Sequence, residues 1–237
     1  QSTEGLRNYV MTLNGIGNIH KMLDNRDEAE NFFRRALKIE TETGNELGQA
    51  INWANLGSIS LSRGQYDSAY MFFARSLTHN EKAGSNLGIA LCHNHFGNIH
   101  ECRGEYREAF KEYKISYDLL KPTSDKWNWL KSCTALANIY LRQHDLTDAR
   151  RVLDEGVATA REIRSFGHLE TLHRYYSQYY EQSGQCSDAL RETKLSMLYR
   201  DSLHMVQDES DVYETRTRYE RDKKAHEIAE LNKENEL

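Results

Sequence analysis

Hydrophobic residues recur along the chain at spacings of three and four, and small residues stand at fixed places among them. Five short segments align at a period of forty residues: IGNIH (16–20), LGSIS (56–60), FGNIH (96–100), LANIY (136–140) and YSQYY (176–180). Twelve residues after the small residue of each segment stands an alanine, at Ala29, Ala69, Ala109, Ala149 and Ala189. Spacings of three and four are typical of amphipathic helices. Their recurrence at a fixed period predicts a series of similar helix pairs.

A turn signal separates the two helices of each predicted pair. It stands seven residues after the small residue, at Asp24, Gly64, Gly104, His144 and Gly184. Glycine commonly ends a helix because it adopts the left-handed conformation without strain. The pattern predicts helices over residues 7–23, 26–43, 47–63, 66–83, 87–103, 106–120, 126–143, 146–164, 167–183 and from 186 onward.

One irregular linker is predicted, at KPTSDKWNW (121–129), where Pro122 is the only proline of the chain. Proline lacks a backbone N–H and ends a helix. The hydroxyl of Thr123 or Ser124 is expected to cap the helix that follows.

Small side chains at two places in each pair allow antiparallel helices to approach closely. In the second pair these are Gly57 and Ala69, and large residues such as Leu56, Ile59 and Phe73 fill the space around them. One pair cannot bury its apolar face alone, so neighbouring pairs are expected to stack.

The segments WANLGSIS (53–60) and GQYDSAYMFFARSL (64–77) resemble the tetratricopeptide repeat, with Trp53, Leu56, Gly57, Ala69 and Phe73 on its signature positions. HEAT repeats have a similar period but lack this spacing of small residues. The resemblance implies an all-α fold, a right-handed α-α superhelix of about five helix pairs over residues 1–200. The pairs fall at about 7–43, 47–83, 87–120, 126–164 and 167–200. The period of forty exceeds the 34 residues of the family, which implies longer helices.

The tail, residues 201–237, has a different composition. DESDVYETRTRYERDKKAHEIAELNKENEL (208–237) contains no glycine or proline and many charges of both signs. Such a segment forms either a solvated helix or a weak coiled coil that joins two copies, and the sequence leaves both open. The tail resembles the charged linker of Bacteroidetes-type signalling proteins. There a tetratricopeptide sensor leads to a membrane span and then to a histidine kinase or a helix-turn-helix regulator.

That second resemblance implies a membrane-associated bacterial protein with this region outside the cytoplasm. Contact with the membrane would come only through a segment beyond Leu237. A cytoplasmic location is the alternative.

No motif for catalysis, metal binding or cofactor binding stands in the sequence. There is no G-x-S-x-G, phosphate loop or metal signature, and the four cysteines show no C-x-x-C spacing. The net charge of −5 disfavours nucleic-acid binding, which needs a basic surface. We expect a binding protein and not an enzyme, without cofactor or metal, whose partner is a protein or peptide.

In the family that the sequence resembles, the first helix of each pair lines a concave groove. The candidate peptide- or partner-binding residues on these helices are Asn14, Asn18, Asn55, Asn94, Asn98, Asn138, Arg142, Arg174 and Gln178. An amide side chain both donates and accepts, so a ladder of amides suits the backbone of an extended peptide. The alternative is that these amides are solvated or bond between adjacent helices.

A clamp for a peptide carboxylate is a weaker candidate. The cations available for it are Lys21, Lys131, Arg142 and Arg174, which are spread over several repeats.

The favoured hypothesis is the sensory or interaction region of a bacterial signal-transduction or transcription regulator. A free-standing adaptor that holds two proteins together is one alternative. A cytosolic regulator that binds a peptide pheromone is another.

Overall fold

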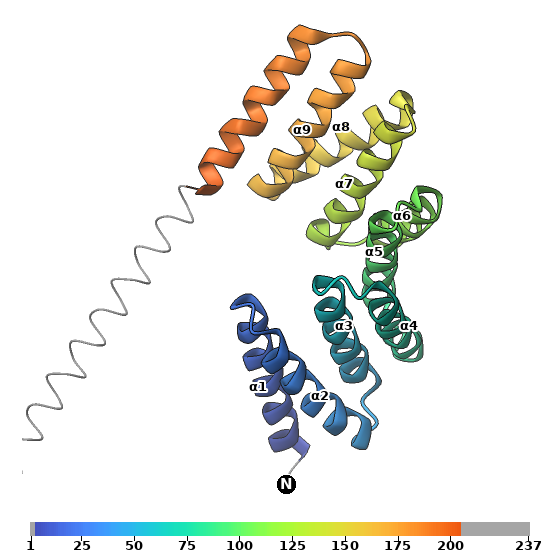
Figure 1. The fold of residues 1–237 in the computed structure, drawn as a ribbon, viewed down its shortest axis with the longest axis vertical. Coiled ribbons are helices and arrows are strands. Elements are labelled where there is room, and N and C mark those ends of the chain that lie inside the picture. Colours follow the sequence, from blue (N-terminus) through green and yellow to red (C-terminus); the bar gives the residue numbers. More distant parts are fainter. Residues whose placement is uncertain (1–2, 205–237) are drawn as a thin grey trace, which may run out of the picture. The chain divides into compact units, whose positions relative to one another are not determined.

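The computed structural model describes residues 3–204, which form helices joined by short turns and contain no strand (Figure 1). The helices are α1 (Thr3–Met22), α2 (Arg26–Glu42), α3 (Glu46–Ser62), α4 (Tyr66–Lys82), α5 (Asn86–Cys102), α6 (Tyr106–Leu120), α7 (Lys126–Arg142), α8 (Leu146–Glu162) and α9 (Phe166–Gln182). A further helical segment covers residues 186–204. Apart from the start of α1, these bounds lie within two residues of the predicted ones. The charged stretch 208–237 lies outside the described residues.

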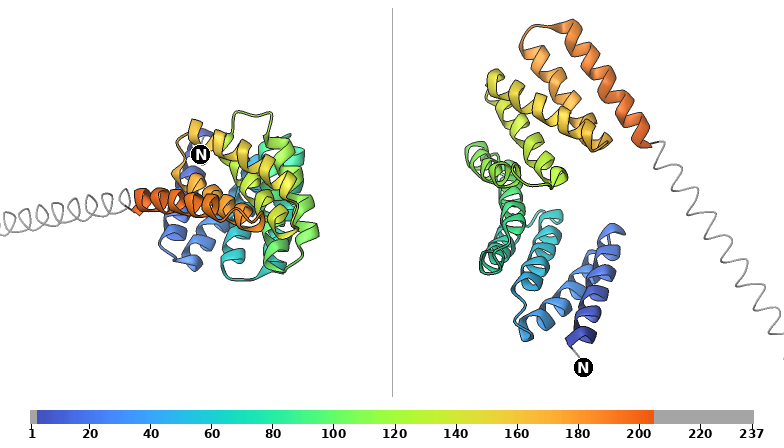
Figure 2. Two further views of the ribbon diagram at one scale, coloured as in Figure 1. Left: turned by 90° about the horizontal axis from the view of Figure 1, so that it is seen from above. Right: turned by 180° about the vertical axis from the view of Figure 1, so that it is seen from behind.

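Two compact units make up the chain, the first ending at Val152 and the second beginning at Leu153. In the first unit, consecutive helices from α1 to α7 pack against one another. Consecutive helices run in opposite directions, as Figure 2 shows from behind. The first helices α3, α5 and α7 also contact one another. The predicted all-α fold of stacked helix pairs is confirmed.

Most helices have seventeen residues and are followed by a turn of three, which gives the forty-residue period of a pair. The five predicted turn residues all adopt a positive φ, between 57° and 76°: Asp24, Gly64, Gly104, His144 and Gly184. Between pairs the same conformation occurs at Gly44, Gly84 and Arg164. The left-handed requirement therefore recurs every twenty residues, except at position 124 in the linker before α7, and glycine meets it at five of the eight positions.

His144 is a place where the turn is strained, because a side chain at φ 57° brings Cβ close to the following carbonyl oxygen. Replacing His144 with glycine is expected to raise the free energy of unfolding by about 0.5–1 kcal/mol, part of the relief being offset by the greater entropy of the unfolded chain. Urea unfolding followed by circular dichroism measures the change. His144→Asn is the matched control and should give a smaller gain, and a destabilised glycine variant would contradict the explanation.

The close approach of paired helices has a common geometry in the first three pairs. An aromatic ring from the second helix lies directly on the glycine of the first. A Cβ atom placed on Gly57 would lie 2.8 Å from the Phe73 ring, and one placed on Gly97 would lie 2.5 Å from the Tyr113 ring. Gly17 has the same relation to Phe33. These glycines are therefore required by packing, as the sequence predicted.

The hydrophobic core is repeated at each junction between pairs. Ala29, Phe33 and Leu37 of α2 pack against Leu56 and Ile59 of α3. At the next junction, Ala69 and Phe73 of α4 pack against Cys92, Phe96 and Ile99 of α5. A second helix thus contributes its apolar face both to its own pair and to the first helix of the next pair.

The linker before α7 differs from the prediction in one detail. The side chain of Asp125, and not that of Thr123 or Ser124, caps the helix by accepting a hydrogen bond from the Asn128 N–H at 3.0 Å. The Thr123 hydroxyl donates to the Leu120 carbonyl and accepts from the Asp125 N–H. Thr123 therefore closes the turn and holds the capping residue in place.

In the second unit, two hydroxyl groups meet at the place where each of the first three pairs has a glycine against an aromatic ring. The sequence has Ser177 and Thr193 at these two positions, and their hydroxyl oxygens lie 2.8 Å apart. Beside them the buried His173 ring pairs with Glu192 through a contact of 2.6 Å. A polar core thus joins α9 to the helical segment 186–204.

Candidate functional site

The predicted site residues all lie on first helices. Asn14 and Asn18 are on α1, Asn55 on α3, Asn94 and Asn98 on α5, Asn138 and Arg142 on α7, and Arg174 and Gln178 on α9. Four of them are exposed, namely Asn18, Asn98, Arg142 and Arg174, and the others are half-buried. The residues of the first unit and those of α9 are described separately below.

Two asparagines bridge α5 and α7. The Asn138 amide donates to a Glu101 carboxylate oxygen at 2.6 Å, and the Asn94 amide donates to the Ser132 hydroxyl at 2.9 Å. The other Glu101 oxygen accepts from the Tyr113 hydroxyl at 2.9 Å. These contacts match the structural alternative, in which amides bond between adjacent helices.

Asn18 and Asn98 have a different setting. Asn18 makes no hydrogen bond with any other described residue, and Asn98 accepts only a weak one from the Cys102 thiol, at 3.4 Å. Their amide donors therefore remain available to a ligand. The predicted ladder therefore contains two kinds of amide. Asn94 and Asn138 bridge adjacent helices, whereas Asn18 and Asn98, which we call the open amides, keep their donors free of other described residues.

This division leads to a stability prediction. Asn138→Ala should lower the free energy of unfolding by about 1–2 kcal/mol, because the half-buried Glu101 carboxylate loses its donor. Asn98→Ala serves as the matched control on the neighbouring helix and should change it by less than about 0.5 kcal/mol. Thermal and urea unfolding of both variants measure the difference, and equal losses would contradict the division.

In the first unit, the charges of two lysines from other repeats act on the ring of His95. The His95 ring of α5 stacks on Phe73, with centroids 4.1 Å apart and planes 7° from parallel. Burial, together with the smaller effects of the charges of Lys131 on α7 and Lys21 on α1, lowers the pKa of His95 to about 4. His95 is therefore neutral at neutral pH.

Lys21 and Lys131 form no ion pair with the described carboxylates. Burial also lowers the pKa of Lys21, because its ammonium group is partly removed from water. The charges of both lysines, which are 110 positions apart in the sequence, thus act on the same His95 ring. We call Lys21, His95 and Lys131 the cationic cluster. The sequence names both lysines as candidates for a carboxylate clamp.

The two candidate arginines are held by neighbouring rings. Arg142 lies 4.9 Å from the centre of the Tyr106 ring and donates to its hydroxyl at 3.4 Å. In the second unit, Arg174 lies 4.9 Å from the Tyr175 ring centre and 3.6 Å from a Glu170 oxygen. Neither arginine belongs to the cationic cluster.

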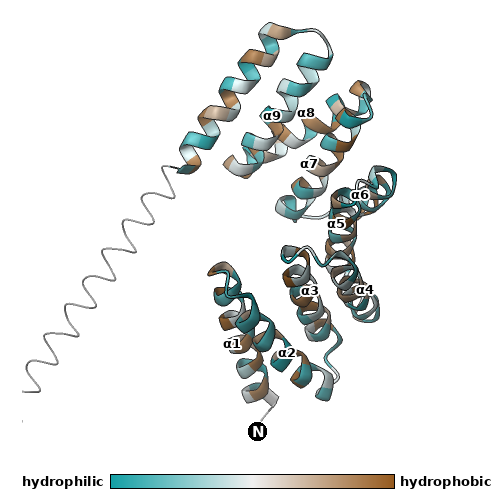
Figure 3. Ribbon diagram, in the orientation of Figure 1, coloured by the Kyte–Doolittle hydropathy of each residue, from teal (hydrophilic) through white to brown (hydrophobic). Residues whose placement is uncertain are grey.

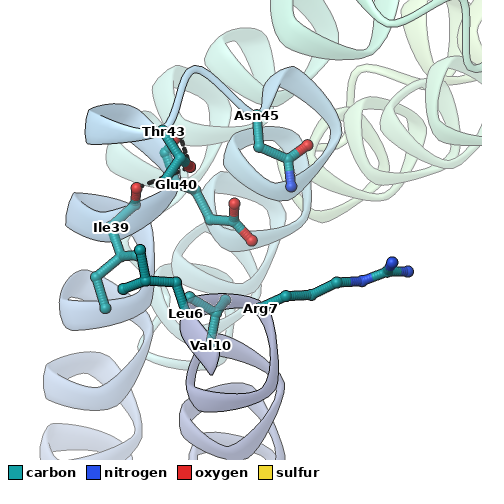
Figure 4. Close-up of a pocket in the computed structure, with 7 residues that line it drawn as sticks. All are labelled: Leu6, Arg7, Val10, Ile39, Glu40, Thr43 and Asn45. Carbon is teal, nitrogen blue, oxygen red and sulfur yellow. Dashed lines mark hydrogen bonds between the residues drawn. The ribbon is translucent and has the colours of Figure 1, made fainter. Parts of the chain in front are cut away.

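A small pocket lies where α1 and α2 meet the start of α3, and the sequence pattern gave no sign of it (Figure 4). Its volume is about 220 Å³, and its lining residues are Leu6, Arg7, Val10, Ile39, Glu40, Thr43 and Asn45. Two of the polar ones have structural roles. The Thr43 hydroxyl donates to helix carbonyls, and Asn45 caps α3. The Arg7 side chain extends away from the other residues drawn (Figure 4).

Within residues 3–204, no three metal-binding side chains lie close enough together to hold an ion. None of the helices described combines the length and apolar character that a membrane crossing requires.

Comparison with known families agrees with the repeat geometry. Two family models described as tetratricopeptide repeat match the chain. One matches residues 48–121, and the other matches residues 10–43 and 129–170. The chain belongs to the tetratricopeptide repeat family. No curated protein matches this tetratricopeptide repeat chain by sequence.

Several solved structures have a similar fold. BtubC from P. vanneervenii has a TM-score of 0.73 at 14% identity, covering 84% of this chain and 82% of that one. A putative kinesin light chain from Podosopora anserina has a TM-score of 0.66 at 14% identity, covering 86% and 100%. A Rap protein complexed with Competence and Sporulation Factor has a TM-score of 0.68 at 16% identity, covering 86% and 58%. At these identities the likeness concerns the tetratricopeptide fold alone.

Proposed function

We propose that the chain binds an extended peptide or protein segment along the first helices of its repeats and does not catalyse a reaction on it. The observation that best supports this proposal is the cationic cluster, in which the charges of two unpaired lysines both act on the neutral His95. Unpaired charges favour a ligand that supplies the opposite charge. The ligand would therefore present an acidic side chain or a terminal carboxylate to Lys21 and Lys131.

The open amides extend this binding surface. Asn18 stands three residues before Lys21 on α1, and Asn98 stands three residues after His95 on α5. Residues three apart on a helix lie on the same side. Each amide can pair with the backbone of a peptide whose charge is held at the cationic cluster.

Binding of this kind would serve regulation. A Rap conjugation gene regulator of similar fold was solved in complex with the Phr* peptide, which supports peptide recognition by this fold. The tail sequence supports placement in a bacterial signal-transduction or transcription regulator. A cytosolic peptide-binding regulator is the second candidate, and the same Rap complex favours it.

Selection from a displayed library of random twelve-residue peptides with free C-termini tests the proposal. The full chain should enrich peptides that contain aspartate or glutamate. A chain with Lys21→Glu and Lys131→Glu should not enrich the same peptides. The proposal is overturned if no peptide is enriched, or if the same peptides are enriched by both chains.

A further inference from the structure

Within residues 3–204, no helix covers the outer face of α1 in the way that the equivalent helices are covered. At the interior junctions, Ile59, Ile99 and Ile139 are buried beneath the second helix of the preceding pair, with exposures of 1% or less. Ile19 occupies the same position on α1 and is 57% exposed, and Leu23, one turn later, is 65% exposed. We call the surface formed by Ile19 and Leu23 the head face.

A second uncovered face lies on the helical segment 186–204. Interior second helices use two positions to contact the next first helix. The first position is occupied by Tyr70 on α4 and by Phe110 on α6. The Tyr70 ring centre lies 4.7 Å from that of Phe96, and the Phe110 ring centre lies 5.4 Å from that of Tyr140. Leu37 and Tyr117 occupy the other and are almost fully buried.

The corresponding residues of segment 186–204 are Leu190, 57% exposed, and Met197, 47% exposed. We call these two residues the tail face. Apolar turns are visible on α1 and on this helix in Figure 3. The head face and the tail face are thus the two halves of one interface that occurs complete at each interior junction.

The two faces also match each other chemically. At the first interior junction, Glu30 of α2 and Arg63 after α3 form an ion pair of 2.5 Å. Counted by the forty-residue period, the residues at these positions on the two ends are Leu190 and Leu23. A charged pair in the interior is replaced by a leucine on both sides, so burying one leucine against the other leaves no charge without a partner.

We propose that the head face of one copy packs against the tail face of a second copy as an additional repeat junction. The contact joins different surfaces of the two copies, so it extends from copy to copy instead of closing a symmetric dimer. This interaction is separate from peptide binding and does not depend on it.

Sedimentation of the full 237-residue chain over a range of concentrations tests the contact. Association should grow with concentration beyond a dimer. Leu23→Glu and Leu190→Glu should each weaken self-association by about tenfold or more, because a charge replaces a buried leucine. Both side chains are exposed in one copy, so neither substitution removes a contact from the fold.

Mixing the two variants distinguishes this arrangement from others. The Leu190→Glu chain keeps an intact head face and the Leu23→Glu chain keeps an intact tail face, so the mixture should form a one-to-one dimer that does not grow. Met11→Glu is the control, since Met11 is 63% exposed on α1 and its equivalent Ile51 is also exposed. A chain that is monomeric at all concentrations, a mixture that stays monomeric, or a loss of association in Met11→Glu would overturn the proposal.

Discussion

Replacing Phe73 with alanine should lower the free energy of unfolding by about 3–5 kcal/mol, the cost typical of truncating a buried aromatic residue. Phe73 is fully buried and serves three helices at once. Its ring covers Gly57 of α3, stacks on His95 of α5 and meets Phe96 edge-on at 6.5 Å. The truncation would therefore leave a cavity within one pair and weaken the junction with the next. Urea unfolding followed by circular dichroism gives the value.

An exposed residue two positions earlier on the same helix provides the control. Met71 is 52% exposed, so Met71→Ala should change the free energy of unfolding by less than about 0.5 kcal/mol. Gly57→Ala tests the close approach from the other side, since the added methyl would meet the Phe73 ring. If Gly57→Ala proved as stable as the parent chain, the glycine would not be a packing requirement.

Reversing both lysines of the cationic cluster is expected to have the largest effect on binding. For an acidic peptide enriched by the parent chain, Lys21→Glu with Lys131→Glu should raise the dissociation constant by more than about a hundredfold. The loss of one charged hydrogen bond costs about 1.5–3 kcal/mol, and each factor of ten corresponds to about 1.4 kcal/mol. Fluorescence polarisation of the labelled peptide measures the change, and the circular dichroism spectrum confirms that the variant is folded.

A charge reversal outside the first helices separates this effect from a change in net charge. Lys38 lies on α2 with its side chain 79% exposed, and Lys38→Glu should leave the affinity within about twofold. Equal losses in both variants would mean that the peptide responds to overall charge and not to the cationic cluster.

The sequence predicted the helices and turns well because both depend on local requirements that recur in each repeat. The positive φ of Gly64 and the burial of Ala69 are examples, since each depends on residues nearby in the chain. The bridging role of Asn138 could not be predicted, because its partner Glu101 belongs to another repeat and the contact depends on side-chain rotamers.

It was harder still to predict from the sequence that Lys21 and Lys131, from different repeats, both act on His95. That effect depends on the summed rotations between successive pairs, and no motif encodes that sum. His95 illustrates the same limit, because its pKa near 4 follows from burial and from charges on two other helices. The sequence therefore predicts the repeating framework more fully than it predicts the groups that this framework brings together.

The regular step of twenty residues between left-handed turns has a consequence for how such chains change length. A duplication or deletion of one forty-residue block leaves every remaining turn residue at its required place, provided that both breaks fall at corresponding positions. The size of a ligand-binding surface can then change by whole repeats through recombination, without a new solution for any turn. An insertion of another length inside a helix would change the number of residues between two successive turns and rotate side chains off the buried face.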